Sequence, residues 1–416
     1  MPNPANPPSI GDLHDEQIVA LLRTGAHAAL LSAYFGDIAY RELSQLARLA
    51  AIRRNDNGDP VLILPGVMGS RLEDSSASPA SLIWLHPAAI GEGLLSQLAL
   101  PGSQSMRASG VMLPGYLKLK LSLESAGFRP LFHPFDWRKD LLTLGDELLA
   151  TVEKLKGPVS VVAHSMGGVV ARAALRKDKS RRIAKLIQLG APNRGSFAPV
   201  QALRAVYPTV RKIAALDFRH TAEELARDVF HTLAGLYHLL PDGDQDFFDV
   251  ARWPRDQLAP NAQMLADART ARALLAPADD RCYLIAGVNQ ETVVAADLRD
   301  SQFEYTIRRD GDGTVPLALA QWRGAQTWYV EENHGGLTNN NSVLAAVDDL
   351  LRSGSTSRLT DRAPATDRDS GRRVTDAELR REAVTKVRWD TLSLDSRRRI
   401  LDPVITPEFK KEVDSG

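Results

Sequence analysis

The sequence contains very little cysteine and no excess of charge of either sign. Its 416 residues include a single cysteine, Cys282, which excludes an internal disulfide framework and any metal site built from several thiolates. Lysine plus arginine number 51, as do aspartate plus glutamate, so the formal net charge is zero. A neutral chain offers no electrostatic footprint for nucleic acid. We therefore expect a fold held by its own core, with no nucleic-acid partner and no metal ion or cofactor.

Long apolar runs are also missing. No run approaches the roughly 18 to 20 apolar residues of a bilayer-spanning helix, so we expect no transmembrane segment. The first thirty residues lack a basic start and place Asp12, Asp15 and Glu16 before the apolar stretch. Arg23 and His27 then interrupt that stretch, which is not typical of a secretory signal. We expect a cytoplasmic protein, with export by a route that needs no cleavable signal as the alternative.

The composition predicts three parts. Residues 1–56 carry apolar residues at helical spacings and are predicted to form an N-terminal helical extension. The turn formers NDNGDP mark the start of a domain over 57–353. Residues 354–416 are predicted to be a polar linker and C-terminal tail. Apolar residues in the tail, enough for a short docking helix, are Trp389, Leu392, Leu394, Ile400 and Leu401. No feature of the sequence predicts an oligomeric state.

Short apolar runs alternate with helical segments in the middle domain. The runs begin near Val61, Arg129, Val159, Ala184, Cys282 and Thr327. Several are apolar almost throughout, as strands are when helices cover both faces of a mostly parallel sheet. The alternation predicts an α/β fold. Two stretches interrupt it, a lid insertion at about 82–113 and a helical cap at about 197–280, the second being too long for an ordinary connection.

One segment predicts a nucleophilic serine. In VSVVAHSMGGVVARAAL an apolar strand leads to Ser165, and an amphipathic helix follows at once. A nucleophile elbow requires this context, with small residues two positions before and two after the serine. Here these are Ala163 and Gly167, and the alanine replaces a more usual glycine without violating the steric argument. A serine in an ordinary strand-to-helix turn is the alternative interpretation.

A serine nucleophile requires a base, and the base requires a group that holds its tautomer. In this arrangement the acid and then the histidine follow the serine along the chain. Of the four downstream histidines, His220, His231 and His238 lie within the predicted cap. His334, in TWYVEENHGGL, follows an apolar run and precedes two glycines, so it is the predicted base.

The predicted acid lies in the segment RRDGDGTVPLALA. Asp312 stands in this glycine-rich loop, three residues before Val315, where a loop between two strands presents a carboxylate to the histidine. Asp310 is the alternative, and it is otherwise explained as a turn former or helix cap.

The oxyanion of a tetrahedral intermediate needs two preorganised backbone N–H groups. Met166, the residue after the serine, is the expected source of one. Val67, in the PGVMGSRLE loop after the first strand of the domain, is the expected source of the other, with Met68 as the alternative. This loop lacks the spacings of nucleotide-binding glycine loops, so we do not expect a phosphate cradle there.

Seven motifs follow one another in the order PGVMGSRLE, LIWLHP, HPFDWRKDL, AHSMGG, LGAPNRGS, DGDGTVP and NHGGL. Over about residues 60–351 the chain resembles the lecithin:cholesterol acyltransferase and lysosomal phospholipase A2 family, a lipase-like branch of the α/β-hydrolases. The resemblance implies an α/β-hydrolase fold, a Ser165, Asp312 and His334 triad, and oxyanion donors at Val67 and Met166. Vertebrate members carry a lid disulfide, for which this chain has no cysteine pair.

The resemblance also suggests contacts around the site. Trp84 stands where the family has a lid tryptophan near the acyl chain, and with Met68 it is an expected substrate contact. Asp136, Trp137 and Arg138 are expected to form a buried structural network, with Arg194 of similar status.

The implied function is cleavage or transfer of a fatty acyl group from a phospholipid-like carboxylic ester through an acyl-serine, without a cofactor. The expected partners are a lipid or ester substrate and the surface of a membrane. A short-chain carboxylesterase or thioesterase is one alternative. A catalytically silent hydrolase fold that acts as a binding module is the other. The acyl specificity and the acceptor, water or an alcohol, are not predicted.

Overall fold

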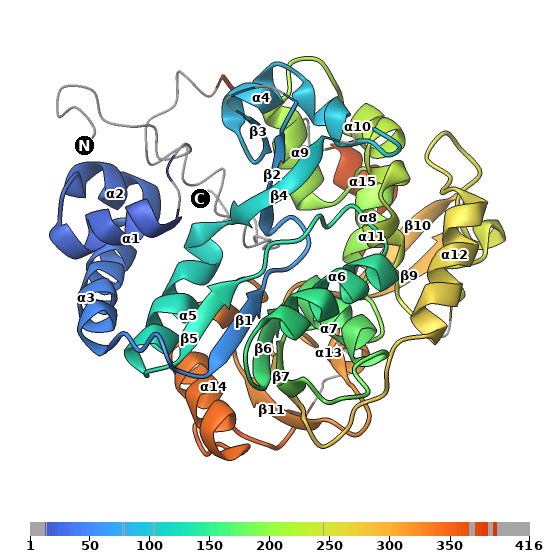
Figure 1. Ribbon diagram of the computed structural model, residues 1–416. Helices are drawn as coiled ribbons and strands as arrows, with labels where there is room; N and C mark the ends of the chain where they lie inside the picture. The colour runs from blue at the N-terminus through green and yellow to red at the C-terminus, as the bar shows by residue number, and fades with distance from the viewer. Residues whose placement is uncertain are drawn as a thin grey trace, which may run out of the picture.

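The computed structural model describes residues 13, 15–76, 78, 80–102, 105–243, 245–365, 371–381 and 386–388. A central sheet is wrapped by helices, with the first three helices at one side and a small sheet that includes residues 292–308 at the opposite side (Figure 1). The apolar residues of the predicted docking helix in the tail lie outside the described residues.

The central sheet has six strands, all parallel, in the order β11-β8-β7-β6-β1-β5. Their bounds are β1 (Pro60–Leu64), β5 (Arg129–Phe132), β6 (Val159–His164), β7 (Ile183–Leu189), β8 (Cys282–Gly287) and β11 (Gln326–Val330). These are the six apolar runs that the sequence predicted as strands. The predicted α/β fold with a mostly parallel sheet is confirmed.

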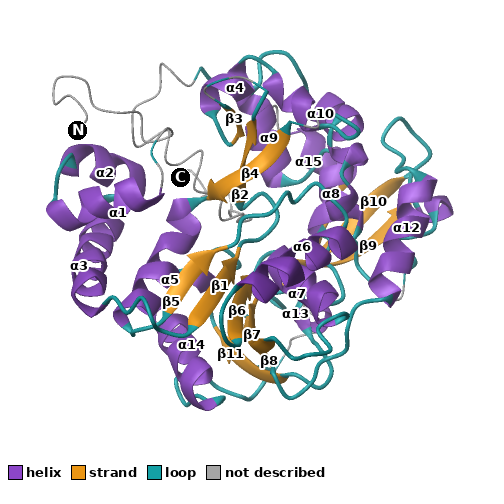
Figure 2. Ribbon diagram, in the orientation of Figure 1, coloured by secondary structure: helices purple, strands orange, loops and turns teal. Residues whose placement is uncertain are grey.

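Helices cover both faces of this sheet (Figure 2). Alternate residues of β1 show how: Leu62 and Leu64 pack in one apolar cluster with α6 (Leu141–Lys154) and α7 (Met166–Leu175). Val61 and Ile63 pack in a second cluster with α5 (Leu113–Ser125) and α14 (Asn341–Ser353). Because both faces are covered, β1 and β8 are buried along their whole length. Cys282, at the start of β8, is also buried.

The N-terminal helices are α1 (Asp15–Thr24), α2 (Ala28–Phe35) and α3 (Asp37–Arg53). Their apolar residues join the cluster around α5 and α14. Among the described residues, no single helix has the length and apolar character to cross a bilayer, and α1 with α2 meets that test only as a pair bent by 119°.

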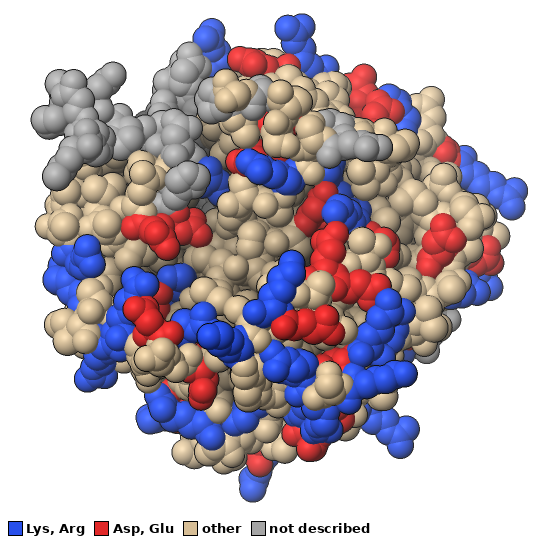
Figure 3. Space-filling view, in the orientation of Figure 1, with Lys and Arg blue, Asp and Glu red and all other residues tan. Residues whose placement is uncertain are grey.

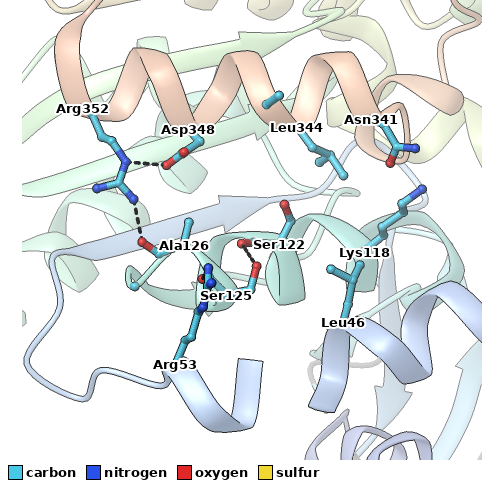
Figure 4. Close-up of a pocket in the computed structure, with 12 residues that line it drawn as sticks. Leu46, Arg53, Lys118, Ser122, Ser125, Ala126, Asn341, Leu344, Asp348 and Arg352 are labelled. Carbon is cyan, nitrogen blue, oxygen red and sulfur yellow. Dashed lines mark hydrogen bonds and ion pairs between the residues drawn. The ribbon is translucent and has the colours of Figure 1, made fainter. Parts of the chain in front are cut away.

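A groove of about 490 Å³ lies where α3, α5 and α14 meet (Figure 4). Its arginine from α14, Arg352, is bonded to Asp348 at 2.8 Å and to the carbonyl oxygen of Ala126 at 2.6 Å. Lys118, from α5, pairs with Glu42 of α3 at 2.8 Å. The cationic side chains Arg352 and Lys118 in this groove therefore have carboxylate partners.

The two predicted insertions lie over the carboxyl ends of the central strands. The first, predicted at about 82–113, contains β3 (Ser81–Trp84), α4 (Pro87–Gly91), η2 (Leu94–Leu98) and β4 (Met106–Val111). Its two strands pair with β2 (Ser70–Asp74), which precedes the predicted start, in an antiparallel sheet of order β3-β2-β4. The second contains α8 (Ala198–Leu203), α9 (Pro208–Leu216), α10 (Ala222–Asp228), η3 (Phe230–Thr232), α11 (Ala234–Tyr237), η4 (Val250–Arg252) and α12 (Ala262–Ala273).

A third sheet, in the order β12-β10-β9, was not predicted. It consists of β9 (Thr292–Arg299), β10 (Gln302–Arg308) and β12 (Arg372–Thr375), all antiparallel. Residues 354–416 were predicted to be a polar linker and tail, yet Thr360 bridges to Tyr329 and β12 pairs with β10. The short helix α15 (Asp376–Arg381) follows, and its Asp376 is fully buried against Arg204 at 3.0 Å. A buried ion pair thus anchors a segment whose composition is polar.

The remaining elements are α13 (Leu317–Ala320) and η5 (Gly336–Thr338). Charged side chains of both signs are interspersed over the face shown in Figure 3, which agrees with the zero net charge.

Candidate active site

Ser165 lies on the turn between β6 and α7. Its backbone has φ 53° and ψ −125°, a strained conformation for a residue with a side chain. The turn is held by a hydrogen bond from its amide to the carbonyl oxygen of Leu189, at 2.9 Å. A Cβ on Gly167 would lie 2.5 Å from the carbonyl oxygen of Pro65, so only glycine fits there. The small residue that the elbow motif requires after the serine is therefore explained by the close approach of the β1 loop.

The structure brings Ser165, His334 and Asp312 into one chain of hydrogen bonds. His334 Nε2 lies 2.9 Å from Ser165 Oγ, and His334 Nδ1 lies 2.7 Å from Asp312 Oδ2. All three residues are buried. This is the geometry in which a carboxylate holds a histidine ring with its second nitrogen facing a serine hydroxyl.

Asp312 is itself held by the backbone. Its Oδ1 accepts hydrogen bonds from the amides of Thr314 at 3.0 Å and Val315 at 2.7 Å. The amide of His334 donates to the carbonyl oxygen of Asp312 at 2.7 Å. Asp312, and not the alternative Asp310, is thus the carboxylate that contacts the His334 ring.

Two glycines make room for the contact between the carboxylate and the histidine. A Cβ on Gly190, whose φ is +58°, would lie 2.9 Å from Asp312 Oδ2 and 3.2 Å from His334 Nδ1. A Cβ on Gly287 would lie 2.7 Å from the Asp312 Cβ. Gly190 directly follows β7 and Gly287 is the last residue of β8, so no side chain occupies these two strand ends where the acid and base meet.

The three cap histidines have other partners. The Nδ1 of His220 lies 2.9 Å from Asp217 Oδ2, the Nε2 of His231 lies 2.9 Å from the carbonyl oxygen of Leu203, and the Nδ1 of His238 accepts from the amide of Leu141 at 2.9 Å. None of these three histidines is hydrogen-bonded to Ser165. Within the described ranges, no group of three or more histidine, cysteine, aspartate or glutamate side chains is arranged to hold a metal ion.

The predicted oxyanion residues lie beside the serine. A Cβ on Gly66 would be 2.9 Å from the Ser165 Cβ, so the β1 loop passes directly against the serine. Val67 and Met68, the next two residues of this loop, line the same cavity as Ser165. Met166 begins α7, and the first amides of a helix have no acceptor within the helix. The positive end of the helix dipole also lies here, which favours a developing negative charge.

A second network, which the sequence did not reveal, joins this loop to the histidine. The amide of Gly66 donates to the Tyr116 hydroxyl at 2.8 Å, so that hydroxyl is free to donate to His164 Nδ1, 2.9 Å away. The His164 Nε2 then donates to the carbonyl oxygen of His334 at 2.9 Å. Burial lowers the pKa of His164 to about 3, with a smaller contribution from His334, which keeps this ring neutral as the network requires.

Ser165 opens into a small, largely apolar cavity of about 90 Å³. The lid insertion contributes Leu85 and Met112 to its wall, and the cap contributes Ala198, Pro199, Ala202, Tyr207, Thr209, Leu236 and Leu239. Tyr207, another residue the sequence did not single out, has its phenol pKa raised by burial. Both insertions thus cover the serine, as a lid and a cap would.

Comparison with models of known protein families identifies the family of this chain. The family model for lecithin:cholesterol acyltransferase matches residues 114–323, half of the 416-residue chain. The chain belongs to this family. Membership makes the protein an ester hydrolase or acyltransferase that acts on lipid esters.

Solved structures with similar folds share little sequence with this member of the lecithin:cholesterol acyltransferase family. The mature Bacillus licheniformis lipase BlEst2 is 14% identical with a TM-score of 0.39, and the likeness covers 72% of this chain and 94% of that one. The Tle4–Tli4 complex contains a chain that is 14% identical with a TM-score of 0.41, over 70% of this chain and 97% of that one. A putative aryl esterase from Burkholderia cenocepacia is 13% identical with a TM-score of 0.32, over 72% and 92%. No curated protein matches the chain in sequence.

The Asp-Trp-Arg segment of this lecithin:cholesterol acyltransferase family member is structural. Arg138 pairs with both carboxylate oxygens of Asp136 at 2.8 Å, and all three residues are buried. The indole of Trp137 donates to the carbonyl oxygen of Ser70 at 3.2 Å. The segment therefore supports the start of β2, as a buried network would.

Trp84 needs a correction. It was expected to line the acyl-chain site, but it is 1% exposed and is not among the residues that line the cavity. Its indole packs edge-on against Trp137 with the ring centroids 5.3 Å apart, and its Nε1 donates to the carbonyl oxygen of Met68 at 2.8 Å. Trp84 thus supports the loop after β1 without lining the cavity, and its neighbour Leu85 lines the cavity instead.

Proposed function

We propose that the protein cleaves or transfers a fatty acyl group from a phospholipid-like ester through an acyl-serine intermediate on Ser165. The observation that carries the proposal is the unbroken contact from Asp312 through His334 to Ser165, at 2.7 and 2.9 Å. Family membership supports the class of substrate.

In this mechanism Ser165 Oγ attacks the ester carbonyl carbon while His334 Nε2 takes its proton. The Asp312 carboxylate orients the ring and stabilises the imidazolium. The amides of Val67 and Met166 stabilise the oxyanion. When the tetrahedral intermediate collapses, the bond to the leaving oxygen breaks and His334 returns the proton to that oxygen. Water or an alcohol then attacks the acyl-serine with His334 again as the base, which releases the acid or the new ester and restores the serine.

The direct test combines labelling with substrate turnover. A fluorophosphonate should label the wild-type protein and a Ser342→Ala control, whose serine is exposed on α14, but not Ser165→Ala. Purified wild type should release fatty acid or a transacylated product from a phospholipid panel read by mass spectrometry. Equal labelling of Ser165→Ala would contradict the assignment, and absent labelling of the wild type would favour a silent binding module.

A short-chain esterase is the second candidate, because the cavity is small. Its volume of about 90 Å³ is well below the roughly 300 to 1,000 Å³ of typical ligand sites. A long acyl chain would therefore require the lid or cap to move. A series of p-nitrophenyl esters from acetate to palmitate separates the two functions: the proposal expects kcat/KM to rise with chain length and with added lipid surface, and a maximum at acetate would favour the short-chain esterase.

A further inference from the structure

A second cavity, of about 780 Å³, lies beside α7 and shares no lining residue with the cavity of Ser165. It is bordered by α12, by the loop after Pro241 and by residues 321–323. Its described charged lining residues are the arginines Arg172, Arg194, Arg269, Arg272 and Arg323 and the aspartates Asp242 and Asp246. Five positive and two negative charges leave a net charge of +3 among these residues. We call this cavity the arginine cleft.

Both aspartates are engaged by arginines at the rim. Asp246 pairs with Arg269 at 2.5 Å, and Asp242 lies 3.9 Å from the Nε of Arg194, whose NH2 also donates to the Asp242 carbonyl oxygen at 2.8 Å. These arginines are about half exposed. The excess positive charge therefore resides on the other arginines of the cleft.

Arg172, from α7, is the first of these. Its Nε donates to the carbonyl oxygen of Ala276 at 3.2 Å, and its NH1 donates to the main-chain and side-chain oxygens of Asn193 at 2.8 and 3.2 Å. Its guanidinium lies 4.9 Å over the ring of Trp322. Among the described residues, no carboxylate forms an ion pair with it.

Arg272, from α12, is the second. Its NH1 donates to the carbonyl oxygen of His238 at 2.9 Å, and its guanidinium lies 5.8 Å from the centre of the Phe248 ring. In the part of the chain that the structure describes, it too forms no ion pair with a carboxylate. A guanidinium has five N–H donors, so each of these two arginines retains donors that these contacts do not use.

The charge on these two arginines is poorly compensated. Burial lowers the pKa of each to about 10, and the charge of Arg272 lowers that of Arg172 further. Both remain protonated at neutral pH. The buried indole N–H of Trp322 also lacks a partner among the described atoms. Both side chains are only partly exposed, and the charge of Asp242 offsets that of Arg272 only in part. An anion in the cleft would therefore offset a desolvation penalty that the fold otherwise carries.

We propose that the arginine cleft binds a phosphate group, at a site separate from the catalytic cavity. Two planar guanidinium groups match the oxygens of a phosphate dianion in charge and in geometry. The cavity volume lies within the roughly 300 to 1,000 Å³ of small-ligand sites. The phosphate belongs either to a soluble monoester or inorganic phosphate, or to the headgroup of an anionic lipid. In the groove of Figure 4, by contrast, Arg352 and Lys118 are paired with carboxylates, and the third cation, Arg53, is exposed to solvent.

The loop over residues 192–196 separates the two cavities. Pro192 and Ser196 line the catalytic cavity, whereas Asn193 and Arg194, between them, line the arginine cleft. Asn193 is buried and its side-chain amide donates a hydrogen bond to the side chain of Gln188 at 2.7 Å, which anchors the loop to β7. Binding in the cleft is thus expected to leave Ser165 accessible.

The test compares wild type with Arg272→Gln, Arg172→Gln and a control, Arg48→Gln. Arg48 is exposed on α3, on the opposite side of the molecule from α12 (Figure 1). Calorimetry and thermal unfolding with inorganic phosphate and with glycerol 3-phosphate, at constant ionic strength, report the soluble ligands. Sedimentation with vesicles of ether-linked phosphatidylglycerol, which has no ester to cleave, reports the headgroup. Hydrolysis of a p-nitrophenyl ester by every variant shows that each one is folded.

We expect wild type and Arg48→Gln to bind either the soluble phosphates or, if they bind neither of these, the phosphatidylglycerol vesicles. For the ligand that binds, the dissociation constant should rise about tenfold or more in Arg172→Gln and in Arg272→Gln. Arg172→Lys, which keeps the charge on α7, should recover part of the affinity if Arg172→Gln is unstable. Which ligand binds identifies the source of the phosphate. Equal binding by all variants, or no binding of any of these ligands by wild type, overturns the proposal.

Discussion

The Nε2 of His164 lies 2.9 Å from the carbonyl oxygen of His334, so the residue before the predicted nucleophile contacts the backbone of the predicted base. The ring of His334 in turn faces Ser165 at 2.9 Å. The two neighbouring residues His164 and Ser165 therefore contact both the main chain and the side chain of His334. This double contact fixes the distance between the serine and the base. Hydrogen bonds from Tyr116 to His164 and from the Gly66 amide to Tyr116 connect it to the β1 loop.

Tyr116→Phe tests this network. The variant leaves the Gly66 amide without its acceptor and His164 without a donor, while the ring still fills its place. A buried donor left unsatisfied costs roughly 1 to 3 kcal/mol, so we expect kcat to fall about tenfold with little change in KM. Steady-state kinetics on a p-nitrophenyl ester measures this, with Tyr40→Phe on α3 as the control. Equal losses in the two variants would show that the network does not position the reacting groups.

Asp312→Asn tests the acid. The amide cannot stabilise the imidazolium, and it favours the wrong ring tautomer, so kcat should fall by up to about 10⁴-fold. Asp310→Asn, two residues away in the same loop, is the matched control and should retain most activity. A larger loss for Asp310→Asn would exchange the two assignments.

Gly190→Ala tests the space between acid and base. The added Cβ would lie 2.9 Å from Asp312 Oδ2 and would displace the carboxylate from His334, so activity should fall at least tenfold. Gly157→Ala is a control for backbone strain, because Gly157 also has a positive φ, of 73°, but its Cβ would meet no atom within 4 Å. Both variants should lose some stability, whereas only Gly190→Ala should lose activity in the folded state. Full activity in Gly190→Ala would contradict the crowding argument.

Stability should fall as the pH drops below about 6.5. Burial lowers the pKa of His133 to about 4, of His238 to about 4 and of His164 to about 3, from the ordinary 6.5. Between about pH 4 and 6.5 the unfolded chain binds protons that the folded protein excludes, so the free energy of unfolding decreases with acidification.

The variant His133→Gln removes one of the groups that bind a proton in the unfolded chain but not in the folded protein. Its plot of unfolding free energy against pH, from urea titrations, should be shallower by up to about 1.4 kcal/mol per pH unit in this window. A slope equal to that of wild type would contradict the lowered pKa of His133 in the folded protein.

Asp376→Asn tests the attachment of the C-terminal segment. Asp376 is fully buried between Arg204 at 3.0 Å and the Tyr305 hydroxyl at 2.8 Å. Removal of its charge leaves the buried Arg204 with Asp256 as its one described carboxylate partner, so we expect the free energy of unfolding to fall by about 3 kcal/mol. Asp361→Asn, an exposed residue, should change it by less than about 0.5 kcal/mol in the same urea titration. Similar stabilities would mean that the ion pair contributes nothing.

The six parallel strands were predictable because strands covered on both faces are apolar throughout, and β1 and β8 show this along their full length. The β9–β10 hairpin was missed, although Phe303, Tyr305 and Ile307 alternate with polar residues in a period of two. β12 carried no comparable signal. Its four residues RRVT are polar in composition, and pairing with β10 supplies their structure.

Around the candidate site, chain order and local motifs predicted which serine, aspartate and histidine come together. The roles of Tyr116 and Trp84 could not be predicted in this way. Tyr116 lies 48 residues before His164 and contacts it from α5, whereas His164 is the last residue of β6. Trp84 supports the β1 loop because it packs against Trp137, and no local pattern encodes that contact.

Cys282 gives a practical route to the motions of the cap. Burial raises the pKa of its thiol to about 12, so at neutral pH almost none of it is the thiolate that reacts with maleimides. Because the sequence has no other cysteine, one introduced at the exposed Phe218 of the cap would be a selective attachment point for a fluorescent or spin label. The native chain can therefore be labelled at one introduced cysteine with little reaction at Cys282, as a spectroscopic study of substrate entry requires.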